Sequence, residues 1–128
     1  MIDASQLPFF ISSPHSGESI PSEVTWLSQL DEKILFCDVD RYVDVLYQPA
    51  IEGHAINYVK TQWHRYVVDL NRLPEDIDAQ SVVGGGDPVK GMVSGIHWAK
   101  TTKGDVLMKE PMSFELHESL VKKYFEPF

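Results

Sequence analysis

Arg65-Tyr-Val-Val-Asp-Leu-Asn-Arg72 is the stretch around which the rest of the chain is organised. Two valines lie between an Arg-Tyr pair and a polar cluster, which predicts a short buried strand with Asp69, Asn71 and Arg72 at its carboxyl end. Open α/β sheets bind their ligands at such strand ends. The segment alone fits a second interpretation equally well, in which Asp69 and Arg72 pair with each other in a surface turn.

Length and charge limit the classes of partner. A chain of 128 residues fits one domain with a substantial core. Its formal charge of −8, from 19 acidic and 11 basic residues, argues against a nucleic-acid partner because binding to a phosphate backbone depends on Lys and Arg. A local cationic pocket can still bind a small acidic molecule, since a site can differ in sign from the whole surface.

Cys37 is the only cysteine, which excludes an intrachain disulfide and a cysteine-based zinc cage. Its apolar neighbours favour a buried, inert thiol. The first six residues lack the basic segment and apolar run of a secretory signal, and no later stretch could span a bilayer. We therefore expect a cytoplasmic protein without a membrane partner.

The order of the expected elements indicates an α/β fold. Apolar runs predict strands at 7–12, 55–59 and 63–70, and helical spacing predicts helices at 22–30, 31–48 and after Ser113. The region 31–48 forms one helix or two pieces broken near Asp38, and Pro49 and Gly53 close it. We expect a loop from Pro74 through the triple glycine, and short irregular strands from 93 to 106.

His15 and Glu18 form a His-x-x-Glu pattern in the turn that follows the first expected strand. Zinc binds imidazole nitrogen and carboxylate oxygen, and in a turn these two side chains can converge on one ion. Two ligands are not a complete site, so a further His or carboxylate must come from elsewhere. An unliganded surface His and Glu is the alternative interpretation.

Asn71 and Arg72 suit the recognition of a carboxylate. Arginine presents a planar fork that matches a carboxylate, and asparagine adds a neutral donor. These two residues can therefore hold an acidic substrate, with Arg65 upstream as a further cation.

Together these motifs resemble a known family. The motifs are Ser13-Pro14-His15-Ser16-Gly17 with Ile20-Pro21, Asp38-x-Asp40, Asp44-x-Leu46-Tyr47, the 65–72 segment and Thr101-Thr102-x-Gly104. Their order resembles the N-terminal half of the N-formylglutamate amidohydrolase family, which is related to zinc carboxypeptidases and to the succinylglutamate desuccinylase and aspartoacylase group. The resemblance implies a three-layer α/β/α fold with a mixed sheet, of the phosphorylase/hydrolase-like type.

Carried over to this sequence, the resemblance makes His15 and Glu18 ligands of zinc or another divalent metal. It places Asn71 and Arg72 on the substrate carboxylate, and Arg65 on the substrate or its carbonyl. Many family members lack a glutamate at the position of Glu18, so Asp38 or Asp40 is the alternative carboxylate ligand.

The implied function is a metal-dependent amidohydrolase that removes the formyl group of an acidic amino acid such as N-formylglutamate, a reaction of histidine degradation. Family members are longer, and their second half carries another metal motif and the general base. Residues 1–128 are therefore expected to form the N-terminal part of a larger domain, with an open sheet edge that favours self-association. Two alternatives remain: a non-catalytic module that binds acidic ligands, and a carboxypeptidase-type peptidase. We expect structural or surface roles for His54, His64, His97 and His117.

Overall fold

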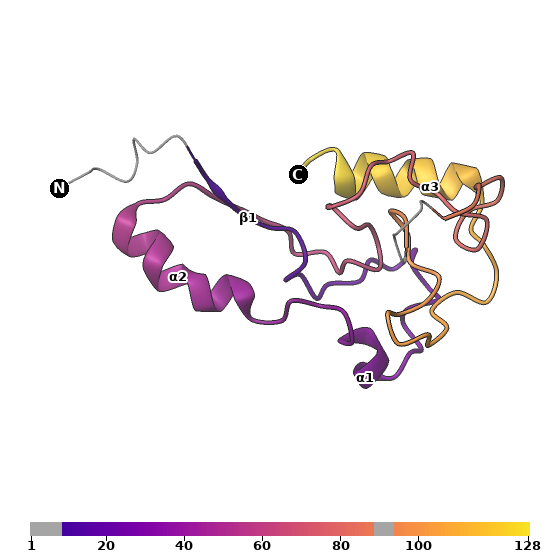
Figure 1. The fold of residues 1–128 in the computed structure, drawn as a ribbon, viewed down its shortest axis with the longest axis horizontal. Coiled ribbons are helices and arrows are strands. Elements are labelled where there is room, and N and C mark those ends of the chain that lie inside the picture. The colour runs from indigo at the N-terminus through magenta and orange to yellow at the C-terminus, as the bar shows by residue number, and fades with distance from the viewer. Residues whose placement is uncertain (1–8, 89–93) are drawn as a thin grey trace.

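The fold combines helices with a small parallel sheet, which is compatible with the α/β class. The computed structural model describes residues 9–88 and 94–128. In chain order the elements are β1 (Ile11–Ser13), α1 (Glu32–Leu35), α2 (Val43–His54), β2 (Tyr58–Lys60), α3 (Phe114–Leu120) and the π-helical η2 (Val121–Phe125), as Figure 1 shows. Within the described residues, no helix is both long and apolar enough to cross a membrane.

The two strands run in parallel and set the position of the site. Ile11 lies opposite Tyr58 in the register of β1 and β2. Isolated bridges extend the pairing past the strand ends, between Gly17 and His64 and between Ser19 and Trp63. This close approach requires glycine, because a Cβ at position 17 would lie 2.4 Å from the carbonyl oxygen of Trp63. The turn after β1 is thereby held against the segment after β2.

The strand predictions are partly confirmed. The first expected strand, 7–12, overlaps β1 at Ile11 and Ser12, and its residues 7 and 8 lie outside the described part of the chain. The second, 55–59, overlaps β2 at Tyr58 and Val59. The strand expected at 63–70 is wrong, because after the isolated bridges at Trp63 and His64 this segment forms turns and irregular structure. Its polar backbone groups are paired elsewhere: the Asp69 N–H donates to the carbonyl of Ile96 (2.8 Å), and the carbonyl of Val67 bonds the His97 ring (2.8 Å). The apolar run therefore indicates burial rather than a strand.

The helical region does break near Asp38, into α1 and α2. Pro49 does not close the region but lies inside α2. Proline has no N–H, so the carbonyl of Val45 lacks its usual hydrogen bond within the helix. Both residues are exposed, so water can bond to that carbonyl. The helix expected at 22–30 is also wrong, since these residues form successive turns.

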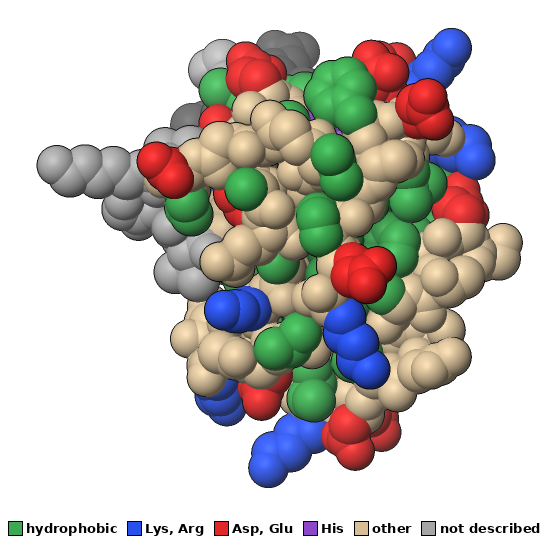
Figure 2. Space-filling view, turned by 90° about the vertical axis from the view of Figure 1, so that its right-hand side faces the viewer, with side chains coloured by type: hydrophobic (Ala, Val, Ile, Leu, Met, Phe, Trp, Pro, Cys, Tyr) green, Lys and Arg blue, Asp and Glu red, His purple; other side chains and the backbone are tan. Residues whose placement is uncertain are grey.

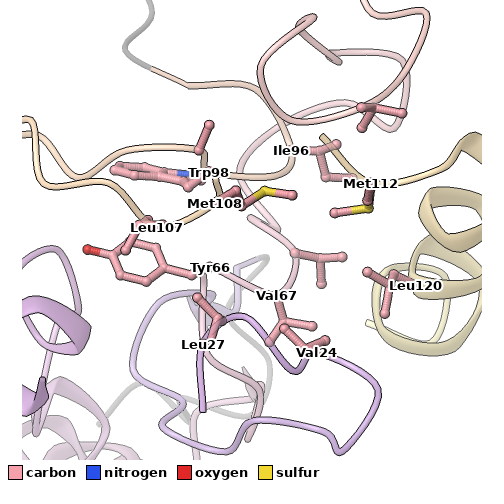
Figure 3. Packing of buried hydrophobic residues seen from close by; sticks show 13 residues of the cluster. Val24, Leu27, Tyr66, Val67, Ile96, Trp98, Leu107, Met108, Met112 and Leu120 are labelled. Atoms are coloured by element: carbon pink, nitrogen blue, oxygen red, sulfur yellow. The ribbon is translucent and has the colours of Figure 1, made fainter. Parts of the chain in front are cut away.

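The last helix begins where its cap predicts. The Ser113 hydroxyl accepts a hydrogen bond from the backbone N–H of Leu116, which satisfies one of the free donors of the first turn. η2 continues α3 directly, so the two form one rod above the loops that carry the site (Figure 1). Leu120 points from this rod into the core (Figure 3).

The hydrophobic core lies between the rod and the loops rather than against the sheet. Tyr66 and Val67 of the 65–72 segment lie near its middle, with Val24 and Leu27 on one side and Leu120 on another (Figure 3). The other members are Val68, Val82, Ile96, Trp98, Ala99, Leu107, Met108 and Met112. Burial of one such large side chain contributes about 1.5–3 kcal/mol, so the 65–72 segment is anchored by packing.

Apolar side chains remain uncovered at the other end of the molecule. Tyr42, Val45 and Leu46 follow helical spacing at the start of α2 and are 56%, 56% and 75% exposed, and Phe10 beside β1 is 63% exposed. On the face in Figure 2, by contrast, acidic and basic side chains are interspersed with small apolar areas. The two-stranded parallel sheet is compatible with α/β, but it does not by itself show three layers or a mixed sheet.

Candidate active site

Asp69 is a fully buried carboxylate at the centre of the site. Its Oδ1 accepts hydrogen bonds from His15 Nε2 (2.7 Å) and the backbone N–H of Asn71 (3.0 Å). Its Oδ2 accepts from Arg65 Nη2 (2.8 Å) and Trp98 Nε1 (3.0 Å). Burial alone raises the pKa of Asp69, but the hydrogen bonds from His15 and Arg65 and the charge of Arg65 outweigh it and hold that pKa well below its usual range. Asp69 is therefore ionised.

His15 lies between two carboxylates, Asp69 and Asp40. It is buried in the turn after β1, and because ionised Asp69 can only accept, His15 Nε2 donates the hydrogen bond between them. Nδ1 lies 3.6 Å from Asp40 Oδ2, and the Asp40 backbone N–H donates to the carbonyl of His15 (3.0 Å). Metal-binding histidines typically bond a carboxylate through the other ring nitrogen, as His15 does here.

The three carboxylates predicted as alternative ligands have different surroundings. Asp38 accepts from the Tyr66 hydroxyl (2.6 Å) and from both the hydroxyl and the N–H of Thr102. Burial raises the pKa of Asp38, but these hydrogen bonds bring it below its usual value. Its oxygens are thus already bonded within the protein.

Glu18 pairs with Arg41, whose Nε lies 2.8 Å from its Oε1, and lines an open groove of about 730 Å³ between α2 and η2. Among the described residues, the carboxylates within 4 Å of the His15 ring are Asp40 and Asp69. The structure thus gives Glu18 a different partner from the predicted one, and its role as a ligand stays a prediction. Asp40 is the carboxylate whose position suits a shared ion.

The donors present fit zinc in part. Two ligands of one tetrahedral zinc lie about 3.3–3.6 Å apart, given bonds of about 2.0–2.2 Å. The 3.6 Å between His15 Nδ1 and Asp40 Oδ2 agrees with that spacing. No group of three or more His, Cys, Asp or Glu that could hold a metal occurs within residues 9–88 and 94–128. This part of the chain therefore offers two donors in suitable positions.

Arg65 is held inside the protein. Its Nη1 donates to the carbonyl of Asp38 (2.7 Å), its Nη2 bonds Asp69, and its guanidinium lies 4.6 Å from the centre of the Trp98 ring. The side chain is only 12% exposed. Nε is buried and has no hydrogen-bond partner among the described residues. Direct contact with a substrate would require Arg65 to leave these partners.

Asn71 and Arg72 lie at the surface next to this cluster. Arg72 Nε donates to the carbonyl of Ser94 (3.0 Å) and Nη1 to the carbonyl of Asn71 (2.9 Å), which holds the guanidinium through two of its three nitrogens. Asn71 is exposed, and within the described residues its side chain makes no hydrogen bond. The second interpretation of this segment, an Asp69–Arg72 pair, is wrong because Asp69 pairs with His15 and Arg65 instead.

The remaining histidines have the structural or surface positions expected for them. His64 is buried between the carbonyl of Leu35 (2.8 Å) and the N–H of Tyr66 (3.1 Å), and burial lowers its pKa to about 4. His97 bonds the His117 ring (2.9 Å), and burial lowers its pKa to about 4 as well. Both rings are neutral near pH 7 and act as hydrogen-bonding core residues.

Comparison with known proteins identifies the family. The profile of the N-formylglutamate amidohydrolase family matches residues 7–128. This chain belongs to the N-formylglutamate amidohydrolase family. The crystal structure of N-formylglutamate amidohydrolase from Ralstonia eutropha JMP134 is similar in fold, with a TM-score of 0.72 and 21% identity. The similarity covers 94% of this chain and 43% of that one, so the chain spans less than half the length of this relative. No curated protein matches the sequence.

The sequence patterns do not identify two members of the candidate site, Asp69 and Trp98. They predict Asp69 only as a polar residue at a strand end or as a partner of Arg72, although a charged residue directly after two valines signals a paired, buried charge. Trp98 was not assigned any role in the site. Nothing local marks it, because its contacts with Arg65 and Asp69 join segments about thirty residues apart.

Proposed function

We propose that this chain provides the substrate-binding groups and part of the metal site of a zinc-dependent amidohydrolase, within a three-layer α/β/α fold with a mixed sheet. The substrate is an N-acylated acidic amino acid such as N-formylglutamate, and the cell compartment is the cytoplasm. Asp69 is the observation that carries the proposal, because one buried carboxylate bonds both His15 and Arg65. It joins the metal-facing residue to the substrate-facing segment.

His15 Nδ1 and Asp40 would hold the zinc, with Glu18 as the alternative carboxylate from the sequence. A bound zinc lowers the pKa of its water towards 7 and polarises a carbonyl oxygen. Asp69 keeps the proton of His15 on Nε2 and so leaves Nδ1 free to bind the metal. Because Arg65 is buried against Asp69, we assign it first to holding this carboxylate in place.

Arg72 and Asn71 would bind the substrate carboxylate. Because two nitrogens of the Arg72 guanidinium bond carbonyl oxygens, its remaining N–H groups are already oriented for a second partner. The free amide of Asn71 adds a neutral donor beside it. This arrangement selects an acidic substrate by charge and by geometry.

The test measures formate released from N-formylglutamate by the native protein that carries this sequence, with zinc and after chelation. We expect release with zinc only, and a loss of at least about 100-fold in His15→Ala. The matched control is His54→Ala, because His54 is exposed at the end of α2. Equal activities of the two variants would rule out the metal role of His15.

The second candidate is a module that binds acidic ligands without catalysis. The number of zinc donors favours this module, because the described residues place only two, whereas a catalytic zinc takes about three protein ligands. Calorimetry separates the candidates: binding of N-formylglutamate without turnover supports the module, and stoichiometric zinc with turnover excludes it. A parallel panel of peptides ending in glutamate tests the carboxypeptidase-type alternative.

A further inference from the structure

His117 of α3 has one ring nitrogen without a partner and lines a groove. The side chain is only 6% exposed, and its Nδ1 lies 2.9 Å from Nε2 of the buried His97. Its other nitrogen, Nε2, has no hydrogen-bond partner among the described residues. Nε2 is not one of the fully buried unpartnered atoms of this part of the chain, so it remains accessible. The groove beside it has a volume of about 500 Å³.

The hydrogen bonds of His97 determine what His117 Nε2 can bind. Burial lowers the pKa of both rings, that of His97 to about 4, so both are neutral near pH 7. The carbonyl of Val67 can only accept, so His97 Nδ1, 2.8 Å away, carries the proton of that ring. His97 Nε2 then accepts, and His117 Nδ1 donates the bond between the two rings. His117 Nε2 is therefore a lone-pair acceptor that faces no donor of the described residues.

The rest of the groove is acidic with an apolar part. Glu75, Glu118 and Glu126 line it together with Lys122, and all four are exposed. Three carboxylates and one ammonium group give this lining a net charge of −2. The ion pairs within the described residues involve none of the four. The apolar part of the lining consists of Pro74, Ile77, Phe114 and Val121.

A buried acceptor, an excess of negative charge and an apolar wall suit an ammonium group on an alkyl chain. Such a group can donate an N–H to His117 Nε2, and the carboxylates attract its charge. Its alkyl chain can pack along the apolar wall, as the stems of lysine side chains do on protein surfaces. A divalent metal fits less well, because within residues 9–88 and 94–128 no three His, Cys, Asp or Glu side chains are grouped to hold one.

We propose that this groove binds an alkylammonium group, with His117 Nε2 as the hydrogen-bond acceptor and Glu118 as a countercharge. The ligand is either a small amine or a lysine side chain of another protein, and both present the same chemistry. The inference does not rest on the proposed amidohydrolase function, because the groove shares no lining residue with His15, Asn71 or Arg72.

The experiment titrates the wild-type chain with n-butylammonium, which has the length of a lysine side chain, at about pH 8, where the imidazole rings are neutral. ¹⁵N NMR of the rings follows His117. We expect a saturable upfield shift of the His117 Nε2 resonance, because this lone pair accepts a new hydrogen bond. Tetramethylammonium is the matched control, since it has the same charge but no N–H, and should leave Nε2 unchanged. Equal shifts with the two cations, or no shift with n-butylammonium, would overturn the proposal.

Two variants of α3 test the countercharge. Glu118→Gln removes a carboxylate of the groove, whereas Glu115→Gln removes one from an exposed position of the same helix outside the groove. We expect the affinity for n-butylammonium to fall at least about twofold in Glu118→Gln and to stay at the wild-type value in Glu115→Gln. Equal affinities of the two variants would contradict the proposed role of Glu118.

A peptide distinguishes the two sources of the ligand. The titration is repeated with the tripeptide acetyl-Gly-Lys-Gly-amide. Tighter binding of the peptide than of n-butylammonium supports a lysine side chain of a partner protein, and weaker binding supports a small amine. Both results require the Nε2 shift of His117, and its absence with both probes would exclude the site.

Discussion

Asp69→Asn is the most informative single change, because it removes the charge at the centre of the site and little volume. Asparagine must turn its amide towards His15 or towards Arg65, so one buried donor faces another donor. The Arg65 charge, 12% exposed, also loses its carboxylate. Breaking a buried ion pair in this way costs about 3–5 kcal/mol, a large part of the stability of a single domain.

The matched control is Asp44→Asn. Asp44 pairs with Lys60 at 3.0 Å, but the lysine side chain is 52% exposed, so this pair contributes about 0.2–1 kcal/mol. Urea unfolding followed by tryptophan fluorescence gives both values. With a slope of about 1–3 kcal/mol/M, the midpoint should fall by about 2 M in Asp69→Asn and by about 0.3 M in the control. Equal shifts would refute the assignment of Asp69 as the buried hub of the site.

Three further results are expected. Burial lowers the pKa of His64 and His97 from 6.5 to about 4, so the unfolded chain binds more protons than the folded chain below pH 6.5. Each residue should therefore lower the free energy of unfolding by up to about 3 kcal/mol between pH 6.5 and 4. Equal urea midpoints at pH 7 and pH 5 would contradict this expectation. Gly17→Ala should lower the free energy of unfolding by about 1–3 kcal/mol, because the new Cβ would lie 2.4 Å from backbone atoms. Gly53→Ala, at a helical position with open space around it, should instead raise the free energy of unfolding by about 0.5–1 kcal/mol. Calorimetric melting of both variants tests whether the two effects have opposite signs. We also propose that the chain self-associates through the open sheet edge beside Phe10. Phe10→Lys should then shift the sedimentation profile towards the monomer. Identical sedimentation profiles of the wild type and the variant would exclude that edge.

The elements predicted correctly are those determined by neighbouring residues. Ser113 caps α3 through a hydrogen bond to a residue three positions later, and the break near Asp38 follows from local interruption of the helical spacing. The prediction that Pro49 closes the helical region was wrong, although it also relied on a local rule. Proline is unfavourable inside a helix, but at this exposed position water can satisfy the carbonyl that it leaves free, so the rule did not hold.

In the 65–72 segment, one prediction was correct and another was wrong. Its apolar residues correctly predicted burial, because burial follows from hydrophobicity alone. Its expected strand did not form, because the partners of its backbone come from the Ile96–His97 region and not from a neighbouring strand. A pattern of apolar residues does not specify which distant groups will satisfy the backbone.

The order of the sequence motifs predicts the family, and the family profile confirms it over residues 7–128. The same motifs contain the side chains of the candidate site, His15, Arg65, Asn71 and Arg72, but not how these side chains are paired. The tertiary structure determines the pairing. It placed His15 against Asp69, 54 residues away, and against Asp40 rather than Glu18. The physical reason is that hydrogen bonds and metal coordination depend on separations of a few ångströms, and such separations between distant residues are set by the packing of the whole chain.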